Sequence, residues 1–443
     1  MRGSAVFRAA VAPGGVLAGP WVKNELWRRA RAVPSLDLQF ADNKSLVDAT
    51  TGASLVTFTR ASSGTYVDSQ GVIKTAATNE ARFDHNPTTG ESLGLLVEEQ
   101  RTNLLLRSEE FDNASWPKLA CSVSMNTTTA PDGLITADTL IESTTNAEHV
   151  TYQSRTGSNE TVTLTIFAKA KERTRARIGF SNFLNEGRGA IYDLQAGTVV
   201  STDANGTDYT SINASIQSCG NGWYRCRFTA TKGNVNTNNT PFIEPVLGTS
   251  FSYTGDGTSG IYIWGAQLEV GAFPTSYIPT TTAAVTRSAD VASIAGSNFS
   301  SWYRQDEGTV FADVNTASVA NIAQGIFDLS EGAGNERIFQ RRNTGSFIVT
   351  AITDNGVVQG DFGSVSVSAS SRARSGLAYR LNDLESAVNG NSSGTDTSAT
   401  IPAPDRIHIG QNFASGQVIN GTIRRLTYWP TRLANNVLQE ITR

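Results

Sequence analysis

The sequence contains little cysteine and little histidine, with three of each among 443 residues. Three cysteines cannot form the disulfide framework of small secreted domains, so stability must come from the burial of apolar side chains. A zinc site needs ligand pairs at short spacing, and neither the cysteines (Cys121, Cys219, Cys226) nor the histidines provide such pairs. The sequence therefore predicts neither a zinc site nor a cofactor.

Charged residues are also few, at 17% of the chain, and methionine occurs only twice. The net charge is −4 at neutral pH, which gives no reason to expect binding to nucleic acid or to an anionic membrane surface. No apolar run approaches the roughly 20 residues of a membrane-spanning helix, so no membrane insertion is predicted. Long helical periodicity is hard to find, and this favours β-structure.

Glycine, serine, threonine and asparagine are abundant, and they separate short runs of alternating apolar and polar residues. Such turn signals recur at about 8–12-residue spacing, which is typical of β-sandwiches and jelly rolls. We predict an all-β fold with two antiparallel β-sandwich or jelly-roll domains, residues 104–285 and 286–443, and a short helical or extended N-terminal arm. A strand-rich connecting segment, residues 35–103, precedes the first sandwich, and a helix is expected at residues 433–441.

Residues 1–34 are basic, whereas the whole chain is acidic. Glu25 is the only acid among them, against the cations Arg2, Arg8, Lys23, Arg28, Arg29 and Arg31. Pro20 and Pro34 bracket a stretch that fits one short helix. One interpretation is a disordered leader; the other, favoured by two tryptophans in so short a segment, is an anchor that orders on a partner. Because this arm contributes no strand, its removal is expected to leave thermal stability nearly unchanged.

Residues 218–228, SCGNGWYRCRF, predict a hairpin that decides how two cysteines are placed. A two-residue loop would split the apolar side chains between two faces. A three-residue loop, Gly220 to Gly222, places them all on one face. Its pairs are Ile216 with Cys226, Ala214 with Phe228 and Ile212 with Ala230. In that register Cys226 faces the core and Cys219 faces away, so no disulfide can join them.

Several segments resemble a module of bacteriophage and prophage virion proteins of the head-spike, head-fibre or tail-fibre type. They are FTRASSGTYVDSQGVIKTAATNEARFDH, residues 58–85, and GLLVEEQRTNLLLRSEEFDNASW, residues 94–116. NGWYRCRFTA and IYIWGAQLEVGAFPTSYIPT resemble strands of a carbohydrate-binding-module-like jelly roll. The tail, YRLNDLESAVNG through RIHIGQN to INGTIRRLTYWPTRLANNVLQEIT, resembles a concanavalin A-like, laminin-G-like sandwich. The resemblance implies an exposed, glycan-facing appendage and supplies no catalytic residue.

Motifs of enzymatic chemistry are missing: there is no helical His pair, no phosphate loop and no Gly-x-Ser-x-Gly. Glycoside hydrolysis needs two carboxylates in one cleft, whereas the adjacent pairs Glu98-Glu99 and Glu109-Glu110 point to opposite faces of a strand. The concanavalin-like glycosidases carry Glu-x-Asp-x-x-Glu, and here Ser115 stands where the third acid would fall. We predict no enzymatic activity, with a polysaccharide depolymerase as the enzymatic alternative.

A sugar-binding site needs an exposed aromatic ring beside polar groups. Trp116, Trp302 and Tyr303 lie in polar contexts, and we predict them as the carbohydrate-binding residues, although a loop tryptophan more commonly packs against its own domain. Trp264 and Trp429 lie in apolar strands and are expected in the core. Asp256, in TGDGTSG, is a candidate ligand for structural calcium, but such a sequence more often forms only a turn.

The resemblance implies a virion appendage that binds a host-surface glycan, and the missing motifs predict that it is non-enzymatic. The expected partners are other virion proteins, reached through the N-terminal arm, and host-surface polysaccharide. A homo-oligomer is expected, located in the virion after assembly in the host cytoplasm. The alternatives are a purely structural decoration or adaptor protein and a capsule-degrading glycosidase.

Overall fold

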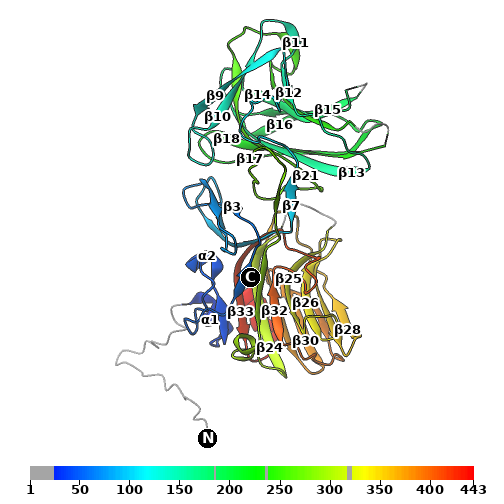
Figure 1. The fold of residues 1–443 in the computed structure, drawn as a ribbon. Helices are drawn as coiled ribbons and strands as arrows, with labels where there is room; N and C mark the ends of the chain where they lie inside the picture. Colours follow the sequence, from blue (N-terminus) through cyan, green and yellow to red (C-terminus); the bar gives the residue numbers. More distant parts are fainter. Residues whose placement is uncertain (1–23, 184–185, 235–237, 317–321) are drawn as a thin grey trace. The chain divides into compact units, whose positions relative to one another are not determined.

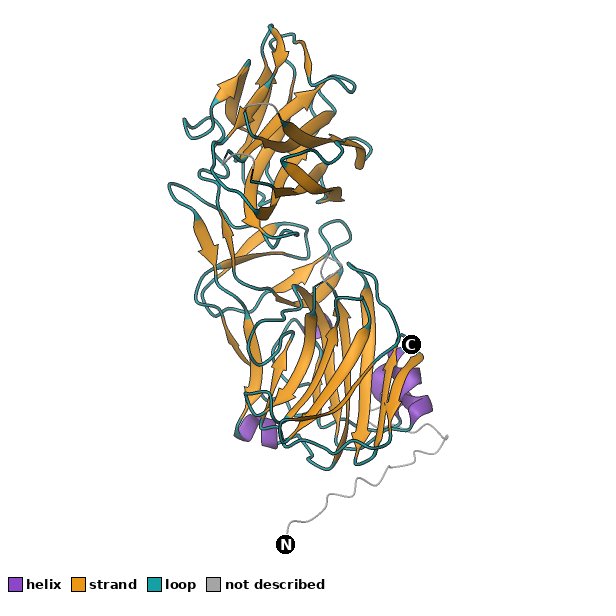
Figure 2. Cartoon of the chain, turned by 90° about the vertical axis from the view of Figure 1, so that its right-hand side faces the viewer, coloured by secondary structure: helices purple, strands orange, loops and turns teal. Residues whose placement is uncertain are grey.

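The computed structural model describes residues 24–183, 186–234, 238–316 and 322–443, and it confirms the all-β class. Strands dominate the described residues, and the helices among them are short (Figure 2). The chain divides into two compact units. The central unit is Thr59–Asp290, and the terminal unit joins Met1–Phe58 to Val291–Arg443. No helix in the described ranges is long and apolar enough to cross a membrane.

The central unit is built on two six-stranded antiparallel sheets (Figure 1). In spatial order, the first contains β17 (Tyr209–Ser218), β18 (Trp223–Lys232), β13 (Glu160–Lys169), β21 (Gly260–Val270), β10 (Ala137–Glu142) and β9 (Cys121–Thr128). The second contains β16 (Thr198–Thr202), β15 (Gly187–Asp193), β14 (Arg175–Ser181), β19 (Thr240–Val246), β12 (Val150–Tyr152) and β8 (Lys118–Leu119). β11 (Asn146–Glu148) pairs with β20 (Ser252–Thr254) beside them.

One apolar core joins these two sheets, because alternating residues of each strand point toward it. On β13, Val162, Leu164 and Ile166 belong to this core. The same core receives Ile178 and Phe180 from β14 of the other sheet. The period-two alternation that predicted a sandwich therefore corresponds to a real inner face.

The hairpin of β17 and β18 confirms the three-residue loop. Ile216 pairs with Cys226 and Ala214 with Phe228, as the apolar pattern required. The third predicted pair, Ile212 with Ala230, is not formed, because the register shifts between Thr210 and Asn213. A bulge there adds an unpaired residue to β17. Cys226 is buried, Cys219 is partly exposed, and all three cysteines are free.

Residues 59–103, part of the predicted connecting segment, belong to the central unit. They form three short antiparallel pairs with their neighbours: β3 (Gly64–Val67) with β4 (Ile73–Ala76), β5 (Phe83–His85) with β6 (Ser92–Val97), and β7 (Arg101–Asn103) with β22 (Val285–Arg287). β2 (Thr57–Thr59) lies at the boundary between the units.

The terminal unit also contains two sheets. One runs β31 (Asn391–Asp396), β30 (Asp383–Val388), β29 (Arg372–Arg380), β24 (Glu307–Asn315) and β33 (Gly421–Trp429), with β1 (Leu36–Leu38) also paired to β33. The other runs β23 (Val291–Ala295), β32 (Arg406–Ile409), β25 (Gln324–Ser330), β26 (Arg337–Arg342), β27 (Ile348–Asp354) and β28 (Val357–Phe362). Short helices α2 (Phe40–Asn43) and α3 (Ser297–Ser300) lie in the connections.

Two further helices cover one face of the first of these sheets: α1 (Glu25–Ala30) and α4 (Asn435–Thr442), the latter at the predicted position. Both bury apolar side chains in one cluster: Leu26, Trp27 and Ala30 from α1, Leu433, Val437, Leu438 and Ile441 from the C-terminal segment, and Phe311, Ala378, Ala387 and Trp429 from the sheet. Asn24 caps α1 by accepting a hydrogen bond from the Trp27 amide, and Arg31 ends it in the left-handed conformation.

This packing differs from the expected independence of the N-terminal arm. Trp27 is only 7% exposed, and its indole N–H donates to the Asp37 carboxylate over 2.8 Å. Burial of this kind stabilises a fold by about 1.5–3 kcal/mol per large side chain. The helical part of the predicted arm therefore belongs to the terminal unit, because its apolar stripe completes a core. Residues 1–23 of the predicted anchor lie outside the described residues.

Candidate functional site

Trp116, predicted as an exposed platform for sugar, lies in the core of the central unit. Its side chain is fully buried, and its indole N–H donates to the Arg107 carbonyl over 2.9 Å. The ring packs against Phe111 with 4.8 Å between centroids. The prediction of an exposed Trp116 is wrong, because a sugar cannot reach a ring that is fully buried.

Trp302 and Tyr303 form part of an aromatic cluster in the terminal unit. Trp302 is 4% exposed and contacts Phe299 and Tyr428, at 4.9 Å and 5.0 Å between ring centroids. Tyr303 is partly buried and stacks on Phe299 at 4.6 Å. The prediction of an exposed Trp302 is therefore wrong. Phe299 lies in α3 and Trp302 follows its end, and their i, i+3 spacing is the sequence signal that the polar context concealed.

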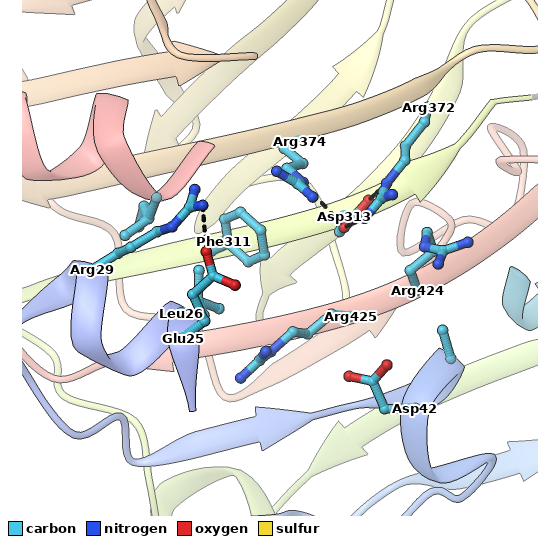
Figure 3. A pocket seen from close by; sticks show the side chains of 12 residues that line it. Glu25, Leu26, Arg29, Asp42, Phe311, Asp313, Arg372, Arg374, Arg424 and Arg425 are labelled. Atoms are coloured by element: carbon cyan, nitrogen blue, oxygen red, sulfur yellow. Dashed lines mark hydrogen bonds and ion pairs between the residues drawn. The ribbon is translucent and has the colours of Figure 1, made fainter. Parts of the chain in front are cut away.

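The terminal unit instead presents a cleft of about 200 Å³ lined with arginine (Figure 3). Its lining comes from both helices of the apolar cluster, from α2 and from three adjacent strands, β29, β24 and β33. The charged members are Glu25, Arg29, Asp42, Asp313, Arg372, Arg374, Arg424 and Arg425. Leu26, Phe311 and Ile441 supply an apolar floor. We call this feature the arginine cleft.

Asp313, on the central strand β24, organises one side of the arginine cleft. Arg372 donates two hydrogen bonds to its carboxylate, at 2.8 Å and 2.6 Å. Arg374, directly opposite Asp313 in the register, approaches the same carboxylate at 3.4 Å. One carboxylate thus holds two guanidinium groups on the same face of the sheet, while Arg372 stays 42% exposed and accessible from solvent.

Asp37 lies beneath the other side of the arginine cleft and positions the side chains there. Its buried carboxylate accepts hydrogen bonds from Arg425 at 2.8 Å and 2.6 Å and from the Thr427 hydroxyl at 2.8 Å. The Trp27 indole donates to the same carboxylate. Arg425 is thereby held in one orientation, and α1 is fixed over the sheet. The Glu25–Arg29 ion pair of α1, at 2.5 Å, then lies along the rim.

A second group of charges, in the central unit, serves folding. Arg60, Arg82 and Arg287 are buried with Glu98 and Asp290. Arg60 pairs with Asp290 at 3.1 Å, and Arg82 pairs with Glu98 at 2.9 Å. Burial alone would raise the pKa of Glu98, but Arg287, Arg82 and two hydrogen bonds from Ser276 lower that pKa to about 2. These five charged residues thus form a buried ion-pair cluster in this unit.

No group of three or more metal-ligating side chains is found in the part of the chain that the structure describes. Asp256, the calcium candidate, accepts hydrogen bonds from the amides of Thr258 and Ser259 and so closes its own turn. Its carboxylate therefore has a structural partner set that does not require an ion.

Comparisons with known proteins give weak likenesses. No protein-family model and no curated protein sequence matches the chain. The CBM40 of the Ruminococcus gnavus IT-sialidase, bound to α2,3-sialyllactose, is 16% identical, with a TM-score of 0.28, over 32% of this chain and 84% of that one. A SAP-like pentraxin from Limulus polyphemus is 12% identical, with a TM-score of 0.25, over 31% and 70%. A Trypanosoma rangeli sialidase in complex with the inhibitor DANA is 10% identical, with a TM-score of 0.28, over 74% and 63%. Likenesses at this level carry no conclusion about the ligand of this chain.

Proposed function

We propose that this protein is a structural virion appendage, of the phage head-spike or tail-fibre type, that binds a host-surface glycan. The observation that carries the glycan-binding part is the arginine cleft, an open, polar-rimmed depression on a sandwich unit. The virion part rests on the resemblance of residues 58–85 and 94–116 to phage virion modules. The remaining contacts to the particle are assigned to the basic N-terminal segment, and several copies per particle are expected.

The ion pairs of the carboxylates in the arginine cleft favour binding without hydrolysis. A glycosidase needs a protonated carboxyl group as general acid beside a second carboxylate. Here the Asp313 carboxylate is paired with Arg372 and Arg374, and the Glu25 carboxylate is paired with Arg29. Glu98 is buried against Arg82 and Arg287, where a saccharide cannot reach it, so it cannot act together with Glu99 on one substrate. A depolymerase is therefore the weaker candidate.

Several copies on one particle would convert weak individual sites into useful avidity. A shallow site gives modest affinity for one saccharide, and simultaneous engagement of linked sites raises the overall affinity by roughly 10²–10⁴-fold. We therefore expect the isolated chain to bind host polysaccharide barely detectably, and clustered chains to bind it well.

The test combines location with binding. Gold-labelled antibodies against the full chain should decorate intact particles, and purified chain clustered on beads should bind host cells and compete with particle adsorption. Decoration without binding would support the spacer alternative, and release of new reducing ends from host polysaccharide would support the depolymerase. Particles that carry no label would refute the virion assignment.

A further inference from the structure

Two consecutive arginines of β33 line the same cleft, which a regular strand does not permit. Successive side chains of a strand point to opposite faces. Asp313 of β24 pairs with Arg425, but the next residue, Val314, pairs with Ile423. Arg424 is therefore the extra residue of a β-bulge. Ile423 and Leu426 on either side are buried, while Arg424 and Arg425 both line the arginine cleft (Figure 3).

The bulge concentrates positive charge at one place on an acidic chain. Five guanidinium groups and three carboxylates line the cleft, and the buried Asp37 beneath Arg425 adds a fourth carboxylate. One positive charge remains in excess, whereas the whole chain carries −4. A guanidinium is a donor only, and these arginines already donate to Asp313, to Asp37 and to the Arg443 carbonyl. An anion entering the cleft would supply acceptors in a place where donors are already held in position.

The arrangement of these donors fits a planar or tetrahedral oxyanion. Asp313 and Asp37 already occupy the Nε–Nη2 forks of Arg372 and Arg425, and they hold both guanidinium groups in one orientation before a ligand arrives. Pre-organised donors lose little conformational entropy when a ligand binds. Leu26, Phe311 and Ile441 close the base of the cleft beside them, and all three side chains are buried. A single cleft on an acidic chain does not provide the basic stripe that nucleic acid requires.

We propose that the arginine cleft recognises an acidic saccharide: a sugar unit bearing a carboxylate or a phosphate group, held by arginines that the β33 bulge brings to one face. The inference rests on the proposed glycan-binding function and names its ligand class. Arg372, Arg424 and Arg425 receive the anionic group.

The test uses the full chain clustered on beads and an array of neutral, carboxylated and phosphorylated glycans. We expect the bound glycans to be acidic. Comparison of the carboxylated set with the phosphorylated set shows which anion is preferred. If carboxylate is the ligand, chemical reduction of the carboxyl groups should abolish binding. Arg424→Gln and Arg372→Gln should each weaken binding by roughly 10- to 100-fold, the range for losing a charge-assisted hydrogen bond. Arg424→Lys should recover part of the loss, because it restores charge without the fork.

The matched control is Arg380→Gln. Arg380 lies on the same strand as Arg372, pairs with Asp383 and does not line the cleft. The Arg380→Gln variant should bind like wild type. Raising the salt concentration to about 0.5 M should weaken wild-type binding, because salt screens the attraction between the arginines and the anion. Preference for neutral glycans, or binding by Arg424→Gln and Arg372→Gln equal to that of Arg380→Gln, overturns the acidic-saccharide inference while leaving glycan binding intact. If the folded wild-type chain, clustered on beads, binds no glycan on the array, the glycan-binding function itself is overturned.

Discussion

Replacing Glu98 by glutamine tests the buried charges that hold the central unit together. Glu98 is 5% exposed, pairs with Arg82 at 2.9 Å and Arg287 at 3.6 Å, and accepts two hydrogen bonds from Ser276. Its pKa of about 2 lies below the ordinary value of 4.5. A difference of this size corresponds to about 3 kcal/mol of folding stability at pH 7. The substitution should therefore lower the free energy of unfolding of the central unit by about 3 kcal/mol, because three buried arginines would then face Asp290 alone.

The pH dependence of that loss has a definite sign. The pKa of Glu98 is depressed in the folded state, so its contribution is complete above pH 4.5 and disappears as the pH falls toward 2. The difference between wild type and Glu98→Gln should shrink from about 3 kcal/mol at pH 7 to about 2 kcal/mol at pH 3.5. Differential scanning calorimetry measures the loss, and hydrogen exchange followed by mass spectrometry assigns it to residues 59–290.

Glu99→Gln is the matched control, since it makes the same chemical change at the adjacent residue. Glu99 is 35% exposed and pairs with Arg101 at 2.5 Å. Such partly exposed pairs contribute about 0–1 kcal/mol, so this variant should unfold nearly like wild type. If Glu98→Gln is no less stable than Glu99→Gln, or if the difference between them does not change with pH, the account of the buried cluster is refuted.

Three further predictions concern the thiols and the terminal unit. Mass spectrometry of unreduced peptides should find every cysteine free, and a Cys219–Cys226 link would contradict the hairpin register. Cys226 should be the slowest cysteine to alkylate in the native protein, because burial raises the pKa of its thiol well above its usual value. Trp302→Ala should destabilise the terminal unit by about 3–5 kcal/mol in thermal unfolding, and an unchanged melting temperature would mean that the ring is not core. Trp27→Ala should lower the free energy of unfolding of the same unit by about 3–5 kcal/mol. Arg28→Ala, on the exposed side of α1, should lower it little, and equal effects of the two substitutions would show that α1 does not contribute to the core.

The sequence allowed the fold class and much local detail to be predicted. Period-two alternation identified the strands, and the glycine-rich loop at residues 220–222 fixed the register of Ile216 with Cys226. The same reasoning failed at Ile212, because the bulge in β17 has no turn residue to signal it, and Ser211 adopts a φ of 52° there. Trp264 and Trp429 are core residues, as their apolar strands indicated.

The arginine cleft could not be predicted in the same way. Its lining comes from segments far apart in the sequence, around residues 25–42, 311–313, 372–374 and 424–425. The strand order β29-β24-β33 and the packing of α1, α2 and α4 on that sheet bring them together. The adjacent Arg424 and Arg425 were a local signal, but alternation assigns neighbours to opposite faces, and only the paired register reveals the bulge. The predicted exposure of Trp116 and Trp302 was wrong, because polar neighbours along the chain do not determine which side chains pack over a ring in space.

The claim that this chain holds a host-surface glycan in the arginine cleft is tested most directly by a crystal structure of the full chain with the acidic oligosaccharide that binds it most tightly on the array. We predict electron density for the anionic group within hydrogen-bonding distance of Arg372, Arg424 or Arg425. Density for the oligosaccharide elsewhere on the chain, with the arginine cleft holding only solvent, would contradict the assignment.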